Sequence, residues 1–298
     1  MKRILLYLLL ITTAPLLLLG QHPNDGARRQ PFDPRTMPRK TSSSGPQIFY
    51  HGGPVMTGAN NHIYVIYYGD FALSTTNIID TFLENLGGSG AYNVNTTYYD
   101  AQQVSIQNVL AYNPASDSYN DTNSMGSKLG GNFAVPLLQS AFSGTHLPVD
   151  SNGIYLEIIS PEVSISSSNY CGYHTHSTAV VPGVDIKYAV IPDPGPKHYA
   201  CSGNVAVYGD TTSPNGDIGA DSVCDTAIHE ISETVTDPDL NAWFGPHGEN
   251  GDLCNFVYGT TFLAANGSHA NHSFGKMDYL VQTIWENTGN GFCALSLP

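Results

Sequence analysis

The most chemically suggestive stretch of this chain is His229-Glu230-Ile-Ser-Glu233, a near match to the His-Glu-x-x-His motif of zinc peptidases. Residues four apart on an α-helix share a face, so His229 and Glu233 can bind one ion. Glu230 lies about 100° round the helix from His229, where its carboxylate reaches a water molecule beside the ion. The spacing therefore indicates two metal ligands and one general base.

A third ligand is expected from the loop Phe244-Gly-Pro-His-Gly-Glu-Asn-Gly-Asp252, which returns acidic groups after the helix ends. Glu249 is the first candidate, and Asp252 and His247 are substitutes if the loop is oriented differently. The alternative is a chance match, with Glu and His side chains forming the solvated face of a helix. The predicted metal ligands are His229, Glu233 and Glu249, and the predicted catalytic base is Glu230.

The ligand set influences which divalent ion is expected. Two histidines and one glutamate leave a zinc site with one net positive charge, whereas one histidine and two glutamates neutralise the ion. The neutral site makes the ion a weaker Lewis acid. Its oxygen content makes manganese or calcium more competitive with zinc. We expect a divalent metal ion, with zinc first and manganese or calcium as alternatives.

Other groups of residues give weaker indications of a metal or catalytic site. Cys171-Gly-Tyr-His-Thr-His176 contains two histidines, but a disulfide-bonded cysteine lacks the thiolate that a metal or nucleophilic role requires, and we do not expect the histidines to chelate together. No Gly-x-Ser-x-Gly turn of a serine hydrolase occurs. Pro214-Asn-Gly-Asp-Ile-Gly219 is interpreted as a turn, with a calcium loop as the alternative. Tyr64, Tyr67 and Tyr68 are expected to pack in the core rather than stack on sugars.

The elements that position these residues alternate between strands and helices. Apolar spacing and β-branched or aromatic runs predict them. Asp221 is the expected N-cap of the motif helix, and Asp237-Pro238 its end. The predicted strands are His62–Tyr68, Val104–Ala111, Gly153–Ser160 and Asp185–Pro192, and the predicted helices are Thr76–Leu86, Phe133–Phe142 and Val223–Val235.

These elements predict a mixed α/β (α+β) fold in one globular domain, with a zincin-like motif helix after a mixed sheet. Residues 1–20 begin with basic residues followed by an apolar run, which is typical of a secretory signal peptide; a membrane anchor is the alternative. Residues 21–46 are polar, basic and proline-rich, which favours a disordered segment, a linker or a pro-segment. The folded domain is predicted over residues 47–298.

Charge excludes some partners. The chain carries 11 basic and 25 acidic residues, but seven of the basic ones lie in positions 1–40. From residue 41 onward there are 4 basic and 23 acidic residues, a net charge of −19. Such a domain repels phosphate backbones and anionic lipid. We expect an extracellular protein, with the cell wall as one candidate location. Its expected partner is a peptide or a cell-wall component. We expect it to bind no nucleic acid, and no membrane after signal cleavage.

Secretion makes disulfides and glycans relevant. All five cysteines lie in the C-terminal half, and we expect Cys171–Cys201 and Cys254–Cys293 to pair and Cys224 to stay free, although spacing does not fix connectivity. The Asn-x-Ser/Thr sequence also predicts a glycoprotein. The four acceptor positions are Asn95, Asn120, Asn266 and Asn271.

Several segments together resemble the EXORDIUM/phosphate-induced protein family of secreted proteins. The matching segments span roughly residues 50–260 and include Gly53-Pro-Val-Met-Thr-Gly58, Tyr170-Cys-Gly-Tyr-His174 and Pro214-Asn-Gly-Asp-Ile-Gly-Ala-Asp221. Thr236-Asp-Pro238 and Gly248-Glu-Asn-Gly-Asp-Leu-Cys254 are similar to a microbial branch with an intact His-Glu helix. The resemblance implies an extracellular protein associated with growth or carbon-status responses, and it strengthens the link between Glu233 and Glu249.

Two functions follow from these observations. The first is metal-dependent hydrolysis, most simply of peptides, with Glu230 deprotonating water. The alternative is a non-catalytic extracellular cell-wall or growth-signalling protein, in which an ion only joins the Glu249 loop to the helix. The two differ in the role of Glu230, which is catalytic in the first and dispensable in the second.

Overall fold

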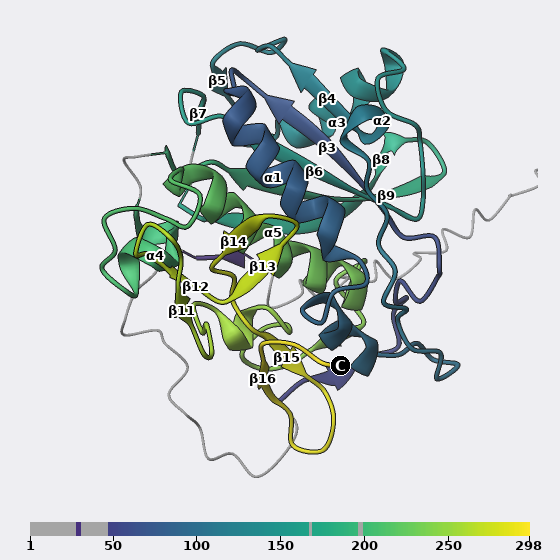
Figure 1. Ribbon diagram of the computed structural model, residues 1–298. Helices are drawn as coiled ribbons and strands as arrows, with labels where there is room; N and C mark the ends of the chain where they lie inside the picture. The colour runs from purple at the N-terminus through teal and green to yellow at the C-terminus, as the bar shows by residue number, and fades with distance from the viewer. Residues whose placement is uncertain (1–27, 31–46, 167–168, 196–198) are drawn as a thin grey trace, which may run out of the picture.

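The computed structural model describes residues 28–30, 47–166, 169–195 and 199–298 (Figure 1). The predicted signal peptide and most of the stretch 21–46 lie outside these residues. Within that stretch, Arg28–Arg29 form a short strand, β1, against the folded domain. Among the described residues, no helix is both long and apolar enough to cross a membrane.

The centre of the molecule is a six-stranded sheet in the order β1-β8-β9-β6-β3-β4. Strands β4, β3, β6 and β9 run parallel, while β8 is antiparallel to β9 and β1 is antiparallel to β8. The bounds are β3 His62–Tyr68, β4 Ser118–Asp121, β6 Gly153–Ile159, β8 Gly172–Val181 and β9 Val184–Pro192.

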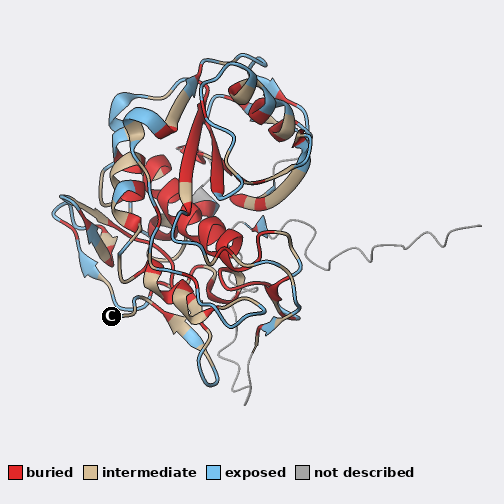
Figure 2. Cartoon of the chain, turned by 90° about the vertical axis from the view of Figure 1, so that its right-hand side faces the viewer, coloured by how far each residue is buried: buried red, intermediate tan, exposed pale blue. Residues whose placement is uncertain are grey.

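Helices cover both faces of this sheet, which explains why its central strands β3 and β6 are buried along almost their whole length. Helices α1 (Leu73–Leu86) and α5 (Ile218–Thr236) pack on one face with Val65 and Leu156. Helix α3 (Ala134–Ser143) packs on the other face, against Ile66. The sheet thus separates two hydrophobic layers, and α5 lies in the larger one (Figures 1 and 2).

Short elements complete the domain below the sheet and around its edges. Among the described residues, further helices are α2 Pro114–Asp117, α4 Gly203–Ala206, η1 Tyr92–Thr97, η3 Tyr199–Cys201 and η4 Asp252–Cys254. The remaining strands are β2 Phe49–Tyr50, β5 Lys128–Leu129, β7 Ser164–Ile165, β10 Trp243–Phe244, β11 Phe262–Leu263, β12 His269–Ala270, β13 His272–Phe274, β14 Met277–Tyr279, β15 Ile284–Glu286 and β16 Phe292–Ala294.

The predicted mixed α/β fold in one globular domain is confirmed, and two local predictions need correction. Val104–Ala111 is not a strand: Ile106 and Leu110 are buried, but the segment makes only isolated bridges, and β4 takes the place beside β3. The motif helix begins at Ile218, earlier than predicted. Its N-cap is Asp217, whose carboxylate accepts the backbone N–H of Ala220 at 3.1 Å.

The two predicted disulfides are present, which confirms the connectivity. Cys171 is bonded to Cys201 at the start of β8, and Cys254 is bonded to Cys293 between η4 and β16. Cys224 is free and buried within α5. Both disulfides therefore fix segments that adjoin the motif helix.

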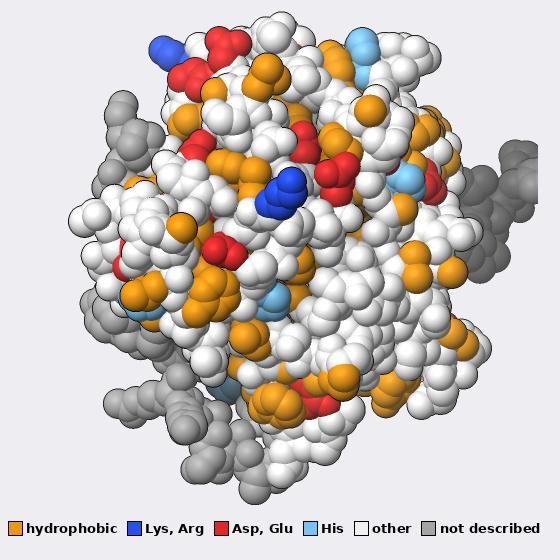
Figure 3. All heavy atoms as spheres, viewed as in Figure 1, with side chains coloured by type: hydrophobic (Ala, Val, Ile, Leu, Met, Phe, Trp, Pro, Cys, Tyr) orange, Lys and Arg blue, Asp and Glu red, His pale blue; other side chains and the backbone are white. Residues whose placement is uncertain are grey.

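The surface agrees with the acidic composition. On the face shown in Figure 3, acidic side chains are scattered among polar ones and lysines are few. Long-range repulsion of anions follows from this balance. The residues of the motif helix are not part of that surface, because every residue of α5 from Gly219 to Thr236 is buried.

Candidate metal centre

His229 is held in one orientation by a neighbouring glutamine. Its Nδ1 lies 3.1 Å from Oε1 of Gln282, while Nε2 of Gln282 donates to the carbonyl of Gly251 at 2.9 Å. Because the amide nitrogen of Gln282 is used in this way, its oxygen accepts the Nδ1 proton of His229. The Nε2 atom of His229 therefore keeps an unprotonated lone pair, which is the form of histidine that binds metals.

That lone pair faces carboxylate oxygens. Nε2 of His229 lies 3.1 Å from Oε1 of Glu233 and 3.7 Å from Oδ1 of Asp252. These three residues form one group whose ligand atoms all lie within 4.8 Å of one another. Ionised carboxylates and an unprotonated nitrogen are all acceptors, so a cation placed between them satisfies all three.

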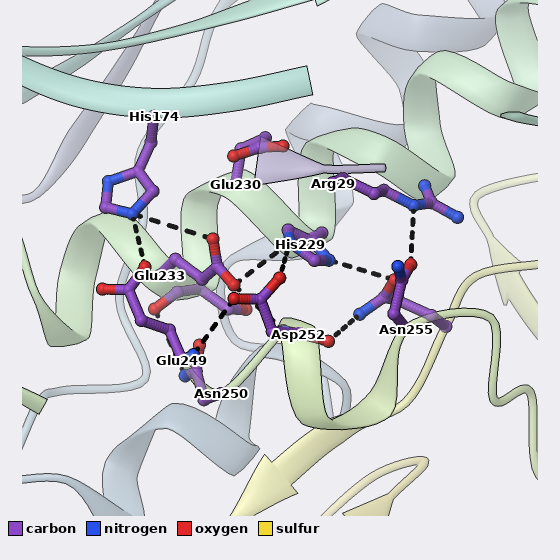
Figure 4. A network of polar contacts seen from close by, with 12 residues as sticks. Arg29, His174, His229, Glu230, Glu233, Glu249, Asn250, Asp252 and Asn255 are labelled. Carbon is purple, nitrogen blue, oxygen red and sulfur yellow. Dashed lines mark hydrogen bonds and ion pairs between the residues drawn. The ribbon is translucent and has the colours of Figure 1, made fainter. Parts of the chain in front are cut away.

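A second group shares the same glutamate. Nε2 of His174, on β8, lies 3.0 Å from Oε2 of Glu249 and 3.7 Å from Oε2 of Glu233. Glu233 thus turns one oxygen toward His229 and the other toward His174 (Figure 4). This is the placement that a carboxylate needs to bridge two metal positions.

Burial shapes the electrostatics of both groups. The pKa of His229 is lowered to about 4, first because burial disfavours its charged form. Burial also raises the pKa values of Glu233 and Glu249 well above the usual range, and it raises the pKa of Asp252 to about 7. An ion-free site therefore retains protons on carboxylates that a divalent cation would replace.

The predicted ligands are all in this region, although they do not form one group. Glu233 belongs to both groups, His229 is grouped with Asp252, and Glu249 is grouped with His174. Asp252 thus occupies the position beside His229 that was first expected of Glu249. His247, the other substitute, is exposed and belongs to neither group.

Sequence reasoning missed His174. On an extended strand, residues two apart share a face, so His174 and His176 both point toward the α5 side of β8. In the register with β9, His174 pairs with Ala189 and His176 pairs with Lys187. They are about 7 Å apart along the strand, and His176 belongs to a separate group. The signal available in the sequence was the Cys-Gly-Tyr-His segment itself, which begins β8 directly over the motif helix.

Glu230 stands beside the two groups without belonging to either. It is fully buried against Gly172 of β8, where an added Cβ would lie only 2.5 Å from Oε1 of Glu230. Burial raises the pKa of Glu230 well above its usual range, and the carboxylate of Glu233 adds to the effect. The nearby charge and backbone amide of Arg29 act in the opposite direction.

Amides support the loop that carries Glu249. Asn250 donates to Oδ1 of Asn95 at 3.2 Å and to the carbonyl of Ser232 at 3.3 Å. Asn95 in turn donates to the hydroxyl of Ser232 at 3.1 Å. Asn95 is completely buried in this network, so it cannot be a glycan acceptor in the folded protein. Of the other predicted acceptors, Asn271 is also buried, whereas Asn120 and Asn266 are exposed.

The reading of the motif as a solvated helix face is wrong for this chain. His229, Glu230, Glu233 and Glu249 are all 0% exposed. Buried ionisable groups are rare unless they are paired or hold ions. Once metal binding displaces their protons, the three carboxylates of the two groups, Glu233, Glu249 and Asp252, carry three negative charges, which offset the charge of one divalent ion and part of the charge of a second. The donor set therefore fits divalent cations.

Two other features are less suited to an ion. His176, Asp185 and Asp239 also lie close together, but Lys187 already pairs with Asp185 at 2.8 Å and with Asp239 at 3.4 Å. A hollow of about 550 Å³ lies at the opposite end of α5, lined in part by Asp193, Asp217 and Gly219. It is lined by residues 215–219 of the predicted turn and by none of the residues grouped around Glu233.

Comparison with known proteins places the chain in a family. The conserved region of phosphate-induced protein 1 matches residues 48–294. The chain belongs to the phosphate-induced protein 1 family. Two Arabidopsis thaliana proteins, EXORDIUM-like 5 and EXORDIUM-like 3, are each 27% identical to it. The alignment with EXORDIUM-like 5 covers 88% of this chain and 84% of the relative. The alignment with EXORDIUM-like 3 covers 95% of this chain and 94% of the relative. No solved structure matches the chain.

Membership in the phosphate-induced protein 1 family confirms the resemblance seen in the sequence. The matched region contains both histidine–carboxylate groups and Glu230, so the candidate centre lies within the part of the chain that defines the family. It does not contain β1, which lies before residue 48.

Proposed function

We propose that this chain is a secreted, metal-dependent hydrolase that cleaves peptides, with divalent ions held around Glu233. The observation that carries the proposal is the unprotonated Nε2 of His229 facing the carboxylates of Glu233 and Asp252 in a fully buried site. A cation is the simplest group that makes this arrangement favourable, because no donor is needed from the protein.

The ligand geometry supports two positions rather than one. His229, Asp252 and Glu233 would hold one ion, and His174, Glu249 and Glu233 would hold a second. Two divalent ions would also replace the protons that burial retains on these carboxylates. Zinc is the first choice because of the histidines, and manganese or calcium compete because carboxylates predominate. When bound, such ions supply Lewis-acid polarisation of a scissile carbonyl.

Glu230 is the residue proposed to move protons. It lies on the same helix as two ligands, yet it is in neither ligand group. In the hydrolase its carboxylate accepts a proton from water and returns it to the leaving amine. The raised pKa of Glu230 suits the second half of this cycle, because it favours the protonated form that donates to the amine.

Extracellular location is part of the proposal. Membership in the family supports an extracellular, growth-related role at the level of the family. Two disulfides also suit an oxidising compartment. The partners proposed are therefore peptides or cell-wall components, in keeping with the acidic domain.

A second function is favoured by one specific observation, the burial of the centre. The histidines, Glu230, Glu233 and Glu249 have no exposed surface, and only the side chain of Asp252 is partly exposed, at 19%. Substrate cannot reach a closed site of this kind without movement of the chain. In the second function the ions join the Glu249 loop and β8 to α5, and the protein is a non-catalytic cell-wall or growth-signalling protein.

Two variants separate these functions. The protein is purified without chelators, its metal content is determined by elemental analysis, and Glu230→Gln is compared with Glu233→Ala for metal content, thermal stability and peptide cleavage. The hydrolase predicts that Glu230→Gln keeps metal and stability but loses cleavage. The structural role predicts that Glu230→Gln changes neither metal content nor thermal stability, and that Glu233→Ala lowers both. In that case neither the wild type nor the variants cleave peptides. Wild-type protein without bound metal contradicts both.

A further inference from the structure

Arg29 occupies a fully closed pocket next to the candidate metal centre. Its guanidinium donates to Oδ2 of Asp225 at 2.5 Å and to Oγ1 of Thr226 at 2.8 Å. Its Nε donates to Oδ1 of Asn255 at 3.3 Å (Figure 4). The ring of Phe256 lies under the guanidinium carbon at 4.4 Å. Arg29 is 0% exposed, although it comes from a polar stretch outside the family region.

The pocket is built for a guanidinium rather than for any cation. Asp225 is held in place by the backbone N–H of Gln282 at 2.7 Å and by the hydroxyl of Tyr258 at 2.7 Å. The pocket therefore offers a fixed carboxylate, a hydroxyl, an amide oxygen and an aromatic face. A planar group with several donors matches that combination, whereas an ammonium does not.

The backbone around Arg29 binds as an added strand. Arg29 pairs with Gly172 and Arg28 with Tyr173 in antiparallel register, and the N–H of Cys171 donates to the carbonyl of Arg29 at 2.7 Å. This strand, β1, covers only two of the ten residues of β8. Addition of an extended peptide to an open sheet edge is a common recognition mode in which the backbone gives affinity and side-chain pockets give specificity.

The added strand lies directly beside Glu230. Gly172 is paired with Arg29 on one side and is in contact with the carboxylate of Glu230 on the other. The main chain of Arg29 is thus placed at the residue proposed to act on peptide bonds. A peptide bound in the same way would present its own backbone there.

We propose that the edge of β8 at Cys171–Tyr173 and the Asp225 pocket form a recognition site for an extended peptide that carries an arginine side chain, and that β1 is its internal occupant. The site selects arginine over lysine through the fixed acceptors of Asp225, Thr226 and Asn255 and the ring of Phe256. Its use for choosing a substrate rests on the proposed hydrolase function, whereas binding of the peptide does not. While β1 is bound, the site is closed to other peptides.

Chemical rescue of an emptied pocket tests this site in the full-length chain. Arg29→Ala leaves Asp225 buried without its cation, which should lower the melting temperature by roughly 10 °C. Millimolar N-acetyl-arginine amide should restore most of the loss. The matched citrulline compound, which has nearly the same shape but no charge, should restore little. The lysine compound should lie between them.

Binding in trans provides the second measurement. A labelled peptide, acetyl-Gly-Ala-Arg-Arg-Gln-amide, should bind Arg29→Ala at least tenfold more tightly than wild type, because β1 no longer competes for the pocket. Adding Asp225→Asn to Arg29→Ala should abolish both binding and rescue. If Arg29→Ala does not accumulate as folded protein, Arg29→Lys replaces it and must show the same order of rescue.

The outcomes are distinct from those of the proposed function. Two results overturn the recognition site even if the protein cleaves peptides. One is equal rescue by the arginine and citrulline compounds, and the other is peptide binding that is unchanged by substitution of Arg29 and Asp225. Arginine-specific rescue in a protein that cleaves nothing supports the recognition site and contradicts only the hydrolase. Both readouts use melting and binding, so neither depends on turnover.

Discussion

Nε2 of His229 lies 3.1 Å from Oε1 of Glu233, one helical turn further along α5, and the imidazole nitrogen brings no proton to the contact. The proton of this imidazole is on Nδ1, where Gln282 accepts it. Two acceptors at this distance in a buried site repel each other unless a proton or a metal ion lies between them. In the ion-free protein the proton that burial favours on Glu233 can take this position, and a bound divalent ion would replace it.

Gln282 should control metal affinity without touching the metal. Replacing Gln282 with Leu removes the acceptor that fixes the tautomer of His229, so metal affinity should fall about 10–100-fold. Gln139→Leu is the control, since Gln139 lies on the surface of α3 and donates only to the carbonyl of Ala179. Affinity is measured by competition with a chelating dye. Equal affinity of Gln282→Leu and wild type would show that the histidine needs no such support.

Metal stoichiometry should depend on Glu233 more than on any other ligand. Because Glu233 belongs to both groups, Glu233→Gln should reduce bound metal from two ions per chain to fewer than one. His174→Gln should remove only the ion that it shares with Glu249. Elemental analysis together with protein quantification gives the ratio. A wild-type ratio of one, unaffected by His174→Gln, would restrict the centre to His229, Glu233 and Asp252.

Gly251 should be sensitive to a single added methyl group. A Cβ there would lie 2.8 Å from Cγ of His229 and 2.9 Å from Oε1 of Glu233. Both side chains are fixed by burial, so Gly251→Ala should destabilise the protein by about 1–3 kcal/mol and weaken metal binding. Gly131→Ala is the matched control, since nothing lies within 4 Å of its Cβ position. Chemical denaturation of both variants measures the difference. A loss as small as that of the control would mean that the η4 loop can move away from the helix.

Local patterns in the sequence predicted the parts of this protein that depend on neighbouring residues. The run of β-branched and aromatic residues at His62–Tyr68 became β3 with the expected bounds, and both disulfides paired as expected. The spacing of His229 and Glu233 was sufficient to place two ligands together. Their burial was not foreseen, because acidic residues on a helix normally face solvent.

The rest of the site depends on pairing between distant segments. His174 reaches the centre only because β8 lies antiparallel to β9 over α5, and the Cys171-Gly-Tyr-His174 segment alone does not specify that pairing. Asp252 rather than Glu249 meets His229 because the chain turns into η4 at this point. Arg29 was assigned to a stretch expected to be disordered, a linker or a pro-segment, and its partners lie almost 200 residues away. Such contacts follow from topology and not from periodicity.

Asp193, at the far end of α5, gives a test of pH dependence that does not involve the metal centre. Burial raises its pKa to about 6 from an ordinary value of 3.8. The folded protein therefore holds a proton on Asp193 between about pH 4 and pH 6, where the unfolded chain does not, and stability falls as pH rises through this range. Asp193→Asn removes this loss while keeping an oxygen for the N–H of Gly195, which donates to the carboxylate at 2.7 Å. The variant should match wild type below pH 4 and should be more stable above pH 6 by on the order of 2–3 kcal/mol.

Urea denaturation at pH 4 and pH 7 measures this difference in stability between Asp193→Asn and wild type. Glu84→Gln, on the exposed side of α1, is the control for the loss of one surface charge. A stability difference that is the same at both pH values, or that has the opposite sign at pH 7, would contradict the raised pKa.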